Sequence, residues 1–135
     1  MITAKLSRHS VIVALHHAVK HRDHISVQAL LDNLTTDKRL QFLFKADSNG
    51  VTALHEAAVR GCTEAVHILL NNLTPEQRLK FLSTRDIAGN TALRYSALNA
   101  HVSPAHLETK TVLEQYYEEA ERIVYRKFVK IKYKL

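Results

Sequence analysis

The stretch DSNGVTALHEAAVRGCTEAVHILL, residues 47–70, predicts two short helices joined by a tight turn. Thr52 can cap the first helix, because its hydroxyl can accept a hydrogen bond from a free backbone N–H at the helix start. Gly61 then ends that helix, since glycine adopts the left-handed backbone conformation that other residues resist. Apolar residues recur at helical spacing in both predicted helices, as Leu54, Ala57 and Ala58 in the first and Ala65, Val66, Ile68, Leu69 and Leu70 in the second. We therefore expect an antiparallel helix pair.

Turns and a third short helix flank this pair. The segments DSNG (residues 47–50) and DIAG (residues 86–89) predict turns, in which the aspartate accepts local backbone hydrogen bonds and the glycine supplies a positive φ. Thr74, Pro75 and Gln77 predict the start of a helix, as its cap, its first residue and its reciprocal capping residue. Each unit thus reads as two helices, a short third helix and a projecting turn, which we call a finger.

The same unit recurs along the chain at an offset of 39 residues. Asp47 then aligns with Asp86, and Thr52 aligns with Thr91. The preceding segment fits the same offset, with identical residues at 15 of the 35 aligned pairs from Val13/Thr52 to Asp47/Asp86. The sequence therefore predicts three units, at about residues 10–46, 47–85 and 86–117, within a single domain of residues 1–135.

Residues 47–70 resemble the ankyrin repeat, whose pattern is D-x-x-G-x-T-P-L-H-x-A-A-x-x-G-H followed by an apolar helix. DIAGNTALRYSALNAH, residues 86–101, is similar in its first half, and residues 11–34 resemble a degenerate repeat that lacks the turn. The chain departs from the pattern where Ala53 and Ala92 replace the proline, Arg94 the histidine and Val13 the threonine. The resemblance implies an all-α helical repeat solenoid, here with an extra short helix per repeat.

A long helix is expected to cap the carboxyl-terminal end. Ser103 and Pro104 read as its N-cap and first residue. A helical apolar stripe follows, formed by Leu107, Val112, Leu113, Tyr116, Tyr117, Ala120, Ile123, Val124 and Phe128. After Phe128, apolar residues alternate strictly with lysines up to Leu135, which predicts an extended strand. The capping helix and its basic tail together occupy residues 103–135.

The resemblance implies a protein that binds another protein and has no enzymatic activity. The partner would meet the finger tips and the outward positions of the first helices, here Ser48, Asn49, Glu56, Val59, Arg60, Ile87, Ala88, Asn90, Tyr95, Leu98 and Asn99. His17, Lys20 and His21 would extend this row. Ile87, Tyr95 and Leu98 are either interface anchors or positions covered by the carboxyl-terminal segment. No residue pattern in the chain indicates a cofactor or a small-molecule substrate.

The charge distribution supports an alternative function. The net charge is +6, and no acid follows Glu121, whereas Arg122, Arg126, Lys127, Lys130, Lys132 and Lys134 do. A basic tail comprising Lys127, Lys130, Lys132 and Lys134 could bind nucleic acid or an anionic membrane. Alternatively, the tail pairs with a partner as a strand, serves as an address signal, or is a frayed end without a binding role. Glu118, Glu119 and Glu121 also resemble glutamate-rich export signals of bacterial type IV effectors, which would place the chain in a host cell. Otherwise we expect a cytoplasmic protein, consistent with its single cysteine.

Two sets of residues could in principle bind a metal or act as a nucleophile, but we expect structural roles for both. His17, His21 and His24 would share one helical face with metal-ligand spacing only if the first helix continued past Arg22-Asp23, where the repeat predicts a turn. His16 aligns with His55, which the resemblance implies is structural. Cys62 is expected to be a buried, inert thiol, because no motif places an activating base beside it. We therefore predict neither a metal site nor a catalytic site.

Overall fold

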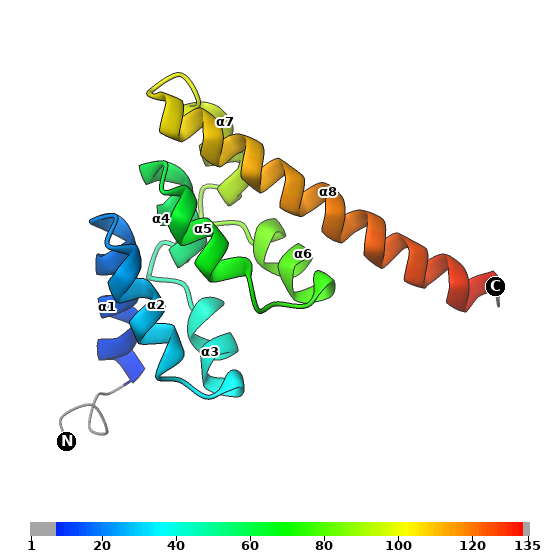
Figure 1. Ribbon diagram of the computed structural model, residues 1–135, viewed down its shortest axis with the longest axis horizontal. Helices are drawn as coiled ribbons and strands as arrows, with labels where there is room; N and C mark the ends of the chain where they lie inside the picture. The colour runs from blue at the N-terminus through cyan, green and yellow to red at the C-terminus, as the bar shows by residue number, and fades with distance from the viewer. Residues whose placement is uncertain (1–7, 134–135) are drawn as a thin grey trace.

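The chain folds into helices alone in a computed structural model that describes residues 8–133 (Figure 1). Eight α-helices and no strand occur in this range. They are α1 (Arg8–Lys20), α2 (His24–Asp32), α3 (Thr36–Leu43), α4 (Ala53–Arg60), α5 (Thr63–Leu70), α6 (Pro75–Ser83), α7 (Ala92–Asn99) and α8 (Pro104–Tyr133). The predicted all-α repeat solenoid with a long carboxyl-terminal helix is confirmed.

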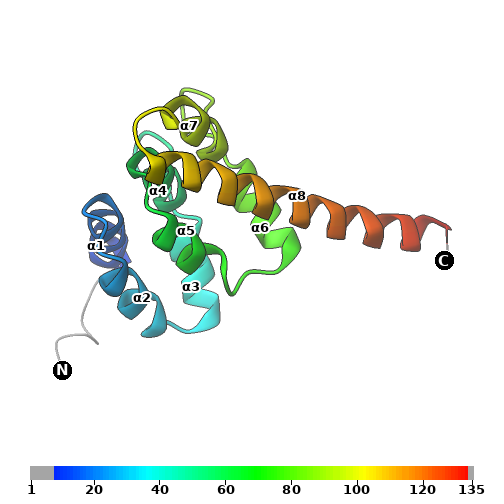
Figure 2. The ribbon, with the colours of Figure 1, turned by 45° about the horizontal axis from the view of Figure 1, so that its top comes forward.

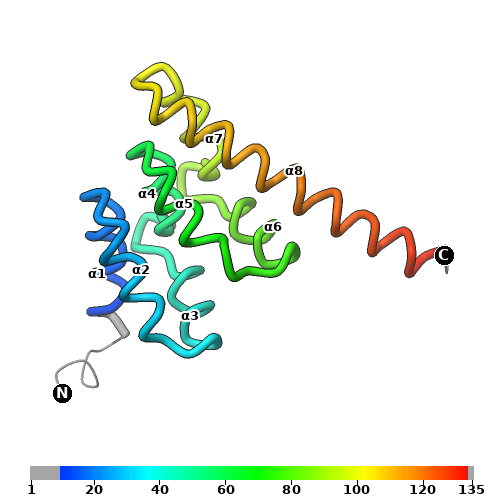
Figure 3. Tube along the Cα trace, in the orientation of Figure 1, coloured from blue at the N-terminus to red at the C-terminus, as the bar shows by residue number. Residues whose placement is uncertain are grey.

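The helices form rows that follow the order of the units (Figures 1 and 3). The first helices α1, α4 and α7 pack in sequence, with α4 between its two neighbours. The second helices α2 and α5 pack side by side, and α8 follows α5. The extra helices α3 and α6 lie beside these rows, and α8 crosses over α6 (Figure 2). The third helices of the first two units therefore widen the solenoid without interrupting the row of first helices.

Threonine caps set where the helices begin. The Thr52 hydroxyl accepts a hydrogen bond from the His55 backbone N–H, and Thr91 caps α7 in the same way. Thr74 forms a complete capping box with Gln77 at the start of α6, where Pro75 occupies the first turn. Each cap satisfies an N–H group that the helix itself leaves without a partner. The predicted starts of all these helices are confirmed.

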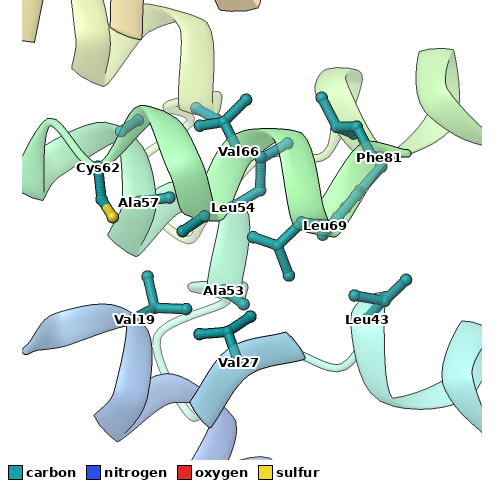
Figure 4. Close-up of a cluster of buried hydrophobic side chains, with 14 of the residues drawn as sticks. Val19, Val27, Leu43, Ala53, Leu54, Ala57, Cys62, Val66, Leu69 and Phe81 are labelled. Atoms are coloured by element: carbon teal, nitrogen blue, oxygen red, sulfur yellow. The ribbon is translucent and has the colours of Figure 1, made fainter. Parts of the chain in front are cut away.

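The core is centred on α4 and α5 (Figure 4) and extends from α1 to Ala92 of α7 and Leu113 of α8. Ala53, Ala57 and Ala58 of α4 are fully buried. Their small side chains let α4 approach the neighbouring helices closely, and larger apolar residues fill the remaining space. These residues come from α1, α2, α3, α4, α5 and α6, and include Val19, Val27, Leu43, Leu54, Val66, Leu69 and Phe81. Burial of each such Val, Leu or Phe side chain stabilises the fold by about 1.5–3 kcal/mol.

The first unit makes its helix–helix turn without glycine. Arg22 has φ 59°, and it aligns at the 39-residue offset with Gly61, which has φ 65°. This left-handed conformation costs a residue other than glycine about 1–2 kcal/mol. The Arg22 guanidinium Nη1 donates to the backbone oxygen of Arg60 at 3.0 Å, so the turn of the first unit is tied to the end of α4. The turn predicted at Arg22-Asp23 is thus confirmed.

Helix α8 corrects the expectation for the carboxyl-terminal tail. The predicted strand is wrong, because α8 continues as a helix through Tyr133, while Lys134 and Leu135 lie outside the described residues. In the first two units, the second helix ends and a threonine, Thr35 or Thr74, caps the start of a separate third helix. After Pro104 the chain contains neither proline nor glycine, so no residue interrupts an established helix as it propagates. Helix α8 therefore replaces the second and third helices of its unit.

The stripe predicted along α8 is buried only in part. Leu113 and Ala120 are buried, and Val112, Tyr116 and Tyr117 pack against the core. Leu107 and Phe128 are exposed instead, at 52% and 56%. We call residues 128–133, which project beyond α6, the overhang (Figures 1 and 2).

Replacement of Gly61 by alanine should destabilise the protein more than replacement of Gly89. Both glycines have positive φ, so each substitution carries a backbone cost of about 1–2 kcal/mol. A Cβ atom at Gly61 would also lie 2.7 Å from Cγ of His106, whereas one at Gly89 meets nothing within 4 Å. The His106 ring would have to leave the Val59 carbonyl oxygen, to which its Nε2 is hydrogen-bonded at 3.1 Å.

Urea unfolding followed by circular dichroism tests this difference. The midpoint should fall in the order wild type, Gly89→Ala, Gly61→Ala. Equal midpoints for the two variants would show that the contact with His106 adds nothing to the stability of the turn.

Candidate functional site

The two fingers are built alike. The Asp47 carboxylate accepts hydrogen bonds from the backbone N–H groups of Asn49 and Val51, at 2.8 and 3.0 Å. The Asp86 carboxylate accepts the equivalent bonds from Ala88 and Asn90, at 3.0 and 2.9 Å. Gly50 and Gly89 have φ values of 77° and 83°. The predicted roles of aspartate and glycine in these turns are confirmed.

Backbone contacts join the fingers to each other and to α4. The Ile87 N–H donates to the Asn49 backbone oxygen at 2.9 Å, so the second finger is fixed against the first. The buried His55 connects the start of α4 to the second finger. Its Nδ1 lies 2.9 Å from the Thr52 hydroxyl, and its Nε2 lies 3.0 Å from the Asn90 backbone oxygen. The structural role implied for His55 is therefore confirmed, and the fingers form a rigid edge.

His16 occupies the equivalent place in the first unit but makes no such pair of contacts. Val13 stands where the second unit has Thr52, so the hydroxyl partner is missing. Burial lowers the pKa of His16, which keeps its imidazole neutral at pH 7. This histidine therefore lies beside the first finger without the hydroxyl partner that Thr52 gives to His55.

Tyr95 has a role that the sequence did not predict. Its hydroxyl donates to the Asp86 carboxylate, and its ring packs edge-on against His55 with centroids 5.9 Å apart. This hydrogen bond, followed by the one from the Asn90 N–H, lowers the pKa of the Asp86 carboxyl. Tyr95 is half-buried, and its hydrogen bond to Asp86 stabilises the second finger. The residue aligned with it in the second unit is Glu56, and the repeat pattern therefore offered no signal for this contact.

The other two predicted anchors are open to solvent. Ile87 at the finger tip is 74% exposed, and Leu98 on α7 is 54% exposed. Helix α8 therefore covers neither side chain. The remaining predicted residues divide into exposed Ser48, Asn49 and Ala88 on the fingers, and half-buried Glu56, Val59, Arg60, Asn90 and Asn99 at the fingers and first helices.

A cleft of about 590 Å³ runs between α1 and the first finger. Four of its lining residues were predicted at the binding surface, namely Ser48, Glu56, His17 and Lys20. The others were not predicted there: Ile12, Val13, His16, Lys45, Ala46 and Asp47. Lys45 and Ala46 directly precede the finger, and this position is the signal that could have identified them. Apolar, cationic and anionic side chains thus meet in one cleft beside the row of first helices.

A second groove, of about 760 Å³, lies between α1 and α2 at the amino-terminal end of the solenoid. Its walls include Val13, Ala14, Ala29 and Leu30, and also His17 and His21, whose rings lie 4.2 Å apart. His24 belongs to α2, beyond the turn, as predicted. Within residues 8–133 no three histidine, cysteine or acidic side chains are grouped as metal ligands would be.

Two further expectations concern Cys62 and the basic tail. Cys62 is buried at the start of α5. Lys127 forms an ion pair with Glu76 of α6, with 2.8 Å between Nζ and Oε1, and this contact lowers the pKa of Glu76. Lys130 and Lys132 are exposed near the end of α8, and Lys134 lies outside the described residues. The basic residues therefore lie on a helix that is partly docked, not on a free strand.

Comparison with known proteins identifies two matching family models. One, described as ankyrin repeats (3 copies), matches residues 12–80, and the other, described as ankyrin repeats (many copies), matches residues 54–107. No curated protein matches the chain. Across residues 8–133, no helix has both the length and the apolar character needed to span a membrane.

Substitution of Tyr95 by phenylalanine should reduce the stability of the fold in a pH-dependent way. The folded-state pKa of Asp86 lies below its ordinary value of about 3.9, so its stabilising contribution is present above that value and is lost as the pH falls through the folded-state pKa. Loss of the Tyr95 hydroxyl makes the downward shift of the Asp86 pKa smaller. The variant should therefore be less stable than wild type at pH 7, with a gap that narrows below about pH 4.

Urea midpoints measured at pH 7, 4 and 3 test this expectation. Tyr133→Phe is the matched control, because that side chain is exposed at the end of α8, and it should follow wild type at each pH. A gap between Tyr95→Phe and wild type that stays constant with pH would contradict the role of the carboxylate.

Proposed function

The chain belongs to the ankyrin repeat family, and we propose that it is a non-enzymatic module that binds a partner protein through its finger tips and first helices. Ankyrin repeats are generally protein-interaction modules, and the family is typically non-enzymatic. The observation that carries the proposal is the exposure of Ile87 and Leu98 beside a rigid finger edge. Exposed apolar side chains surrounded by polar groups are typical of interface anchors.

The rigidity of the fingers favours tight binding. A surface whose loops are already ordered loses little conformational freedom when a partner docks. The hydrogen bonds of Asp47, Asp86, His55 and Tyr95 supply this order before any partner arrives. We infer that the edge formed by the two fingers is already ordered before the partner binds.

The arrangement of side chains suggests how the partner is recognised. Ile87 and Leu98 provide apolar anchors, and the backbone and side-chain groups of Ser48 and Asn49 provide a polar rim. The cleft beside α1 can accept a protruding side chain of the partner between Lys20, Lys45 and Glu56. The partner would therefore lie across all three first helices. Export as a bacterial effector stays a prediction.

Simultaneous replacement of Ile87 and Leu98 by serine should abolish most partner binding. Loss of two apolar anchors typically weakens an interface about tenfold or more. The experiment is affinity capture from a cell lysate on the immobilised chain, with quantitative mass spectrometry of the retained proteins. Circular dichroism would first show that the double variant is folded.

Ile25→Ser is the matched control. Ile25 is 73% exposed, almost the same as Ile87, but it lies on α2, outside the row of first helices. Proteins retained by wild type and by Ile25→Ser but lost from the double variant would support the proposal. Equal retention by the double variant would show that the fingers and first helices are not the binding surface.

A further inference from the structure

Polar contacts show how α8 lies across the other helices. Near its start, His106 Nε2 lies 3.1 Å from the Val59 backbone oxygen, and the Thr109 hydroxyl lies 2.9 Å from that of Thr63. Farther along, the Tyr116 hydroxyl is 2.7 Å from Nδ1 of His67, and its ring lies under the Arg78 guanidinium. The series ends at the ion pair of Lys127 with Glu76 in the first turn of α6. Beyond it, the overhang projects past the stack (Figure 2).

The face of α8 that packs on the stack continues into the overhang. Steps of three and four residues connect Leu113, Tyr117, Ala120, Val124, Phe128 and Ile131, so these side chains lie along one side of the helix. Exposure rises along this line. Leu113 and Ala120 are buried, Val124 is half-buried, Phe128 is 56% exposed and Ile131 is 80% exposed. The apolar stripe therefore extends farther than the stack that covers it.

Basic residues accompany this stripe. No acid follows Glu121, and the last turns carry Arg126, Lys127, Lys130 and Lys132. The Lys127–Glu76 pair shows how such a lysine contacts a carboxylate on a helix that packs against α8. Lys130 is one helical turn farther along and is exposed. Pairing of the overhang with the same segment of a second copy would place lysine against lysine, which disfavours it.

We propose that the overhang docks an acidic amphipathic helix of a partner protein, which lies alongside α6 and extends the α6–α8 interface. Apolar residues of that helix would cover Phe128 and Ile131, and its glutamates or aspartates would pair with Lys130 and Lys132. The site is separate from the fingers. It does not depend on the function proposed above.

The shape of the overhang favours a helix over a flat surface. Leu113 and Ala120 bury this side of α8 against the stack, in which α6 packs on α8, so a bilayer brought against Phe128 and Ile131 on the same side would meet the stack first. Tyr125 and Tyr133 are exposed on other sides of the same helix, so the segment lacks the single apolar face that inserts into a membrane. A partner helix about 10 Å across would continue the packing that α6 already makes on α8.

Binding of a labelled synthetic peptide to the full chain tests the proposal. The probe is a helix of about 18 residues with a leucine stripe flanked by glutamates, measured by fluorescence anisotropy. Phe128→Gln with Ile131→Gln should weaken binding about tenfold or more, because glutamine keeps helix propensity but removes the apolar contact. Lys130→Glu should weaken binding severalfold, and the loss should shrink at high salt.

Two controls separate this site from other surfaces. Ile25→Gln removes an equally exposed isoleucine on α2 and should bind the peptide as wild type does. The double serine variant of Ile87 and Leu98 should also bind normally, so a failure at the fingers and a failure here remain distinguishable. A peptide with the same composition but a scrambled leucine stripe should bind at least severalfold more weakly.

Several outcomes would overturn the proposal. These are no binding of the peptide, equal binding of the scrambled peptide, or an equal loss with Ile25→Gln. Vesicles containing phosphatidylserine and a DNA duplex serve as competing probes. If either binds wild type, loses affinity in the Phe128/Ile131 variant and outcompetes the peptide, the overhang recognises a membrane or nucleic acid instead.

Discussion

The solenoid depends on the close approach of α4 to its neighbours. Helix α4 packs against α1, α5 and α7, and its small residues Ala53, Ala57 and Ala58 are all fully buried. A larger side chain at any of them would separate the first helices and force surrounding side chains out of their preferred rotamers. The same approach places His55, which is held by Thr52, where its Nε2 reaches the second finger at Asn90. Packing in the core and order at the fingers therefore have one origin.

Local chemistry made much of this fold predictable. The capping threonines, Gly61 and the aspartates of the fingers each act through backbone groups within a few residues, so their roles follow from sequence spacing alone. The 39-residue repeat then carried these assignments from one unit to the next. The role of His55 followed only from the family resemblance, because its partner Asn90 lies in the next unit.

The remaining features depend on contacts that the repeat does not encode. Tyr95 holds Asp86 nine positions earlier, and no equivalent tyrosine occurs in the other units. Alternation after Phe128 predicted a strand, but a strand needs a partner for its backbone groups, whereas a helix already under way needs none. Exposure of Ile87, Leu98 and Ile131 is set by where the stack ends, and no single residue pattern reveals that boundary.

Helix α8 also makes the molecule a rigid arm. Thirty helical residues span about 45 Å, and the contacts of His106, Thr109, Tyr116 and Lys127 hold most of that length against α4, α5 and α6. The free end therefore keeps a fixed direction relative to the fingers. A fluorophore placed at exposed Tyr125 would rotate with the whole molecule, and a helical protein fused in continuous register to α8 would be held at a defined angle. The chain is thus suited to serve as an orienting handle in imaging and distance measurements.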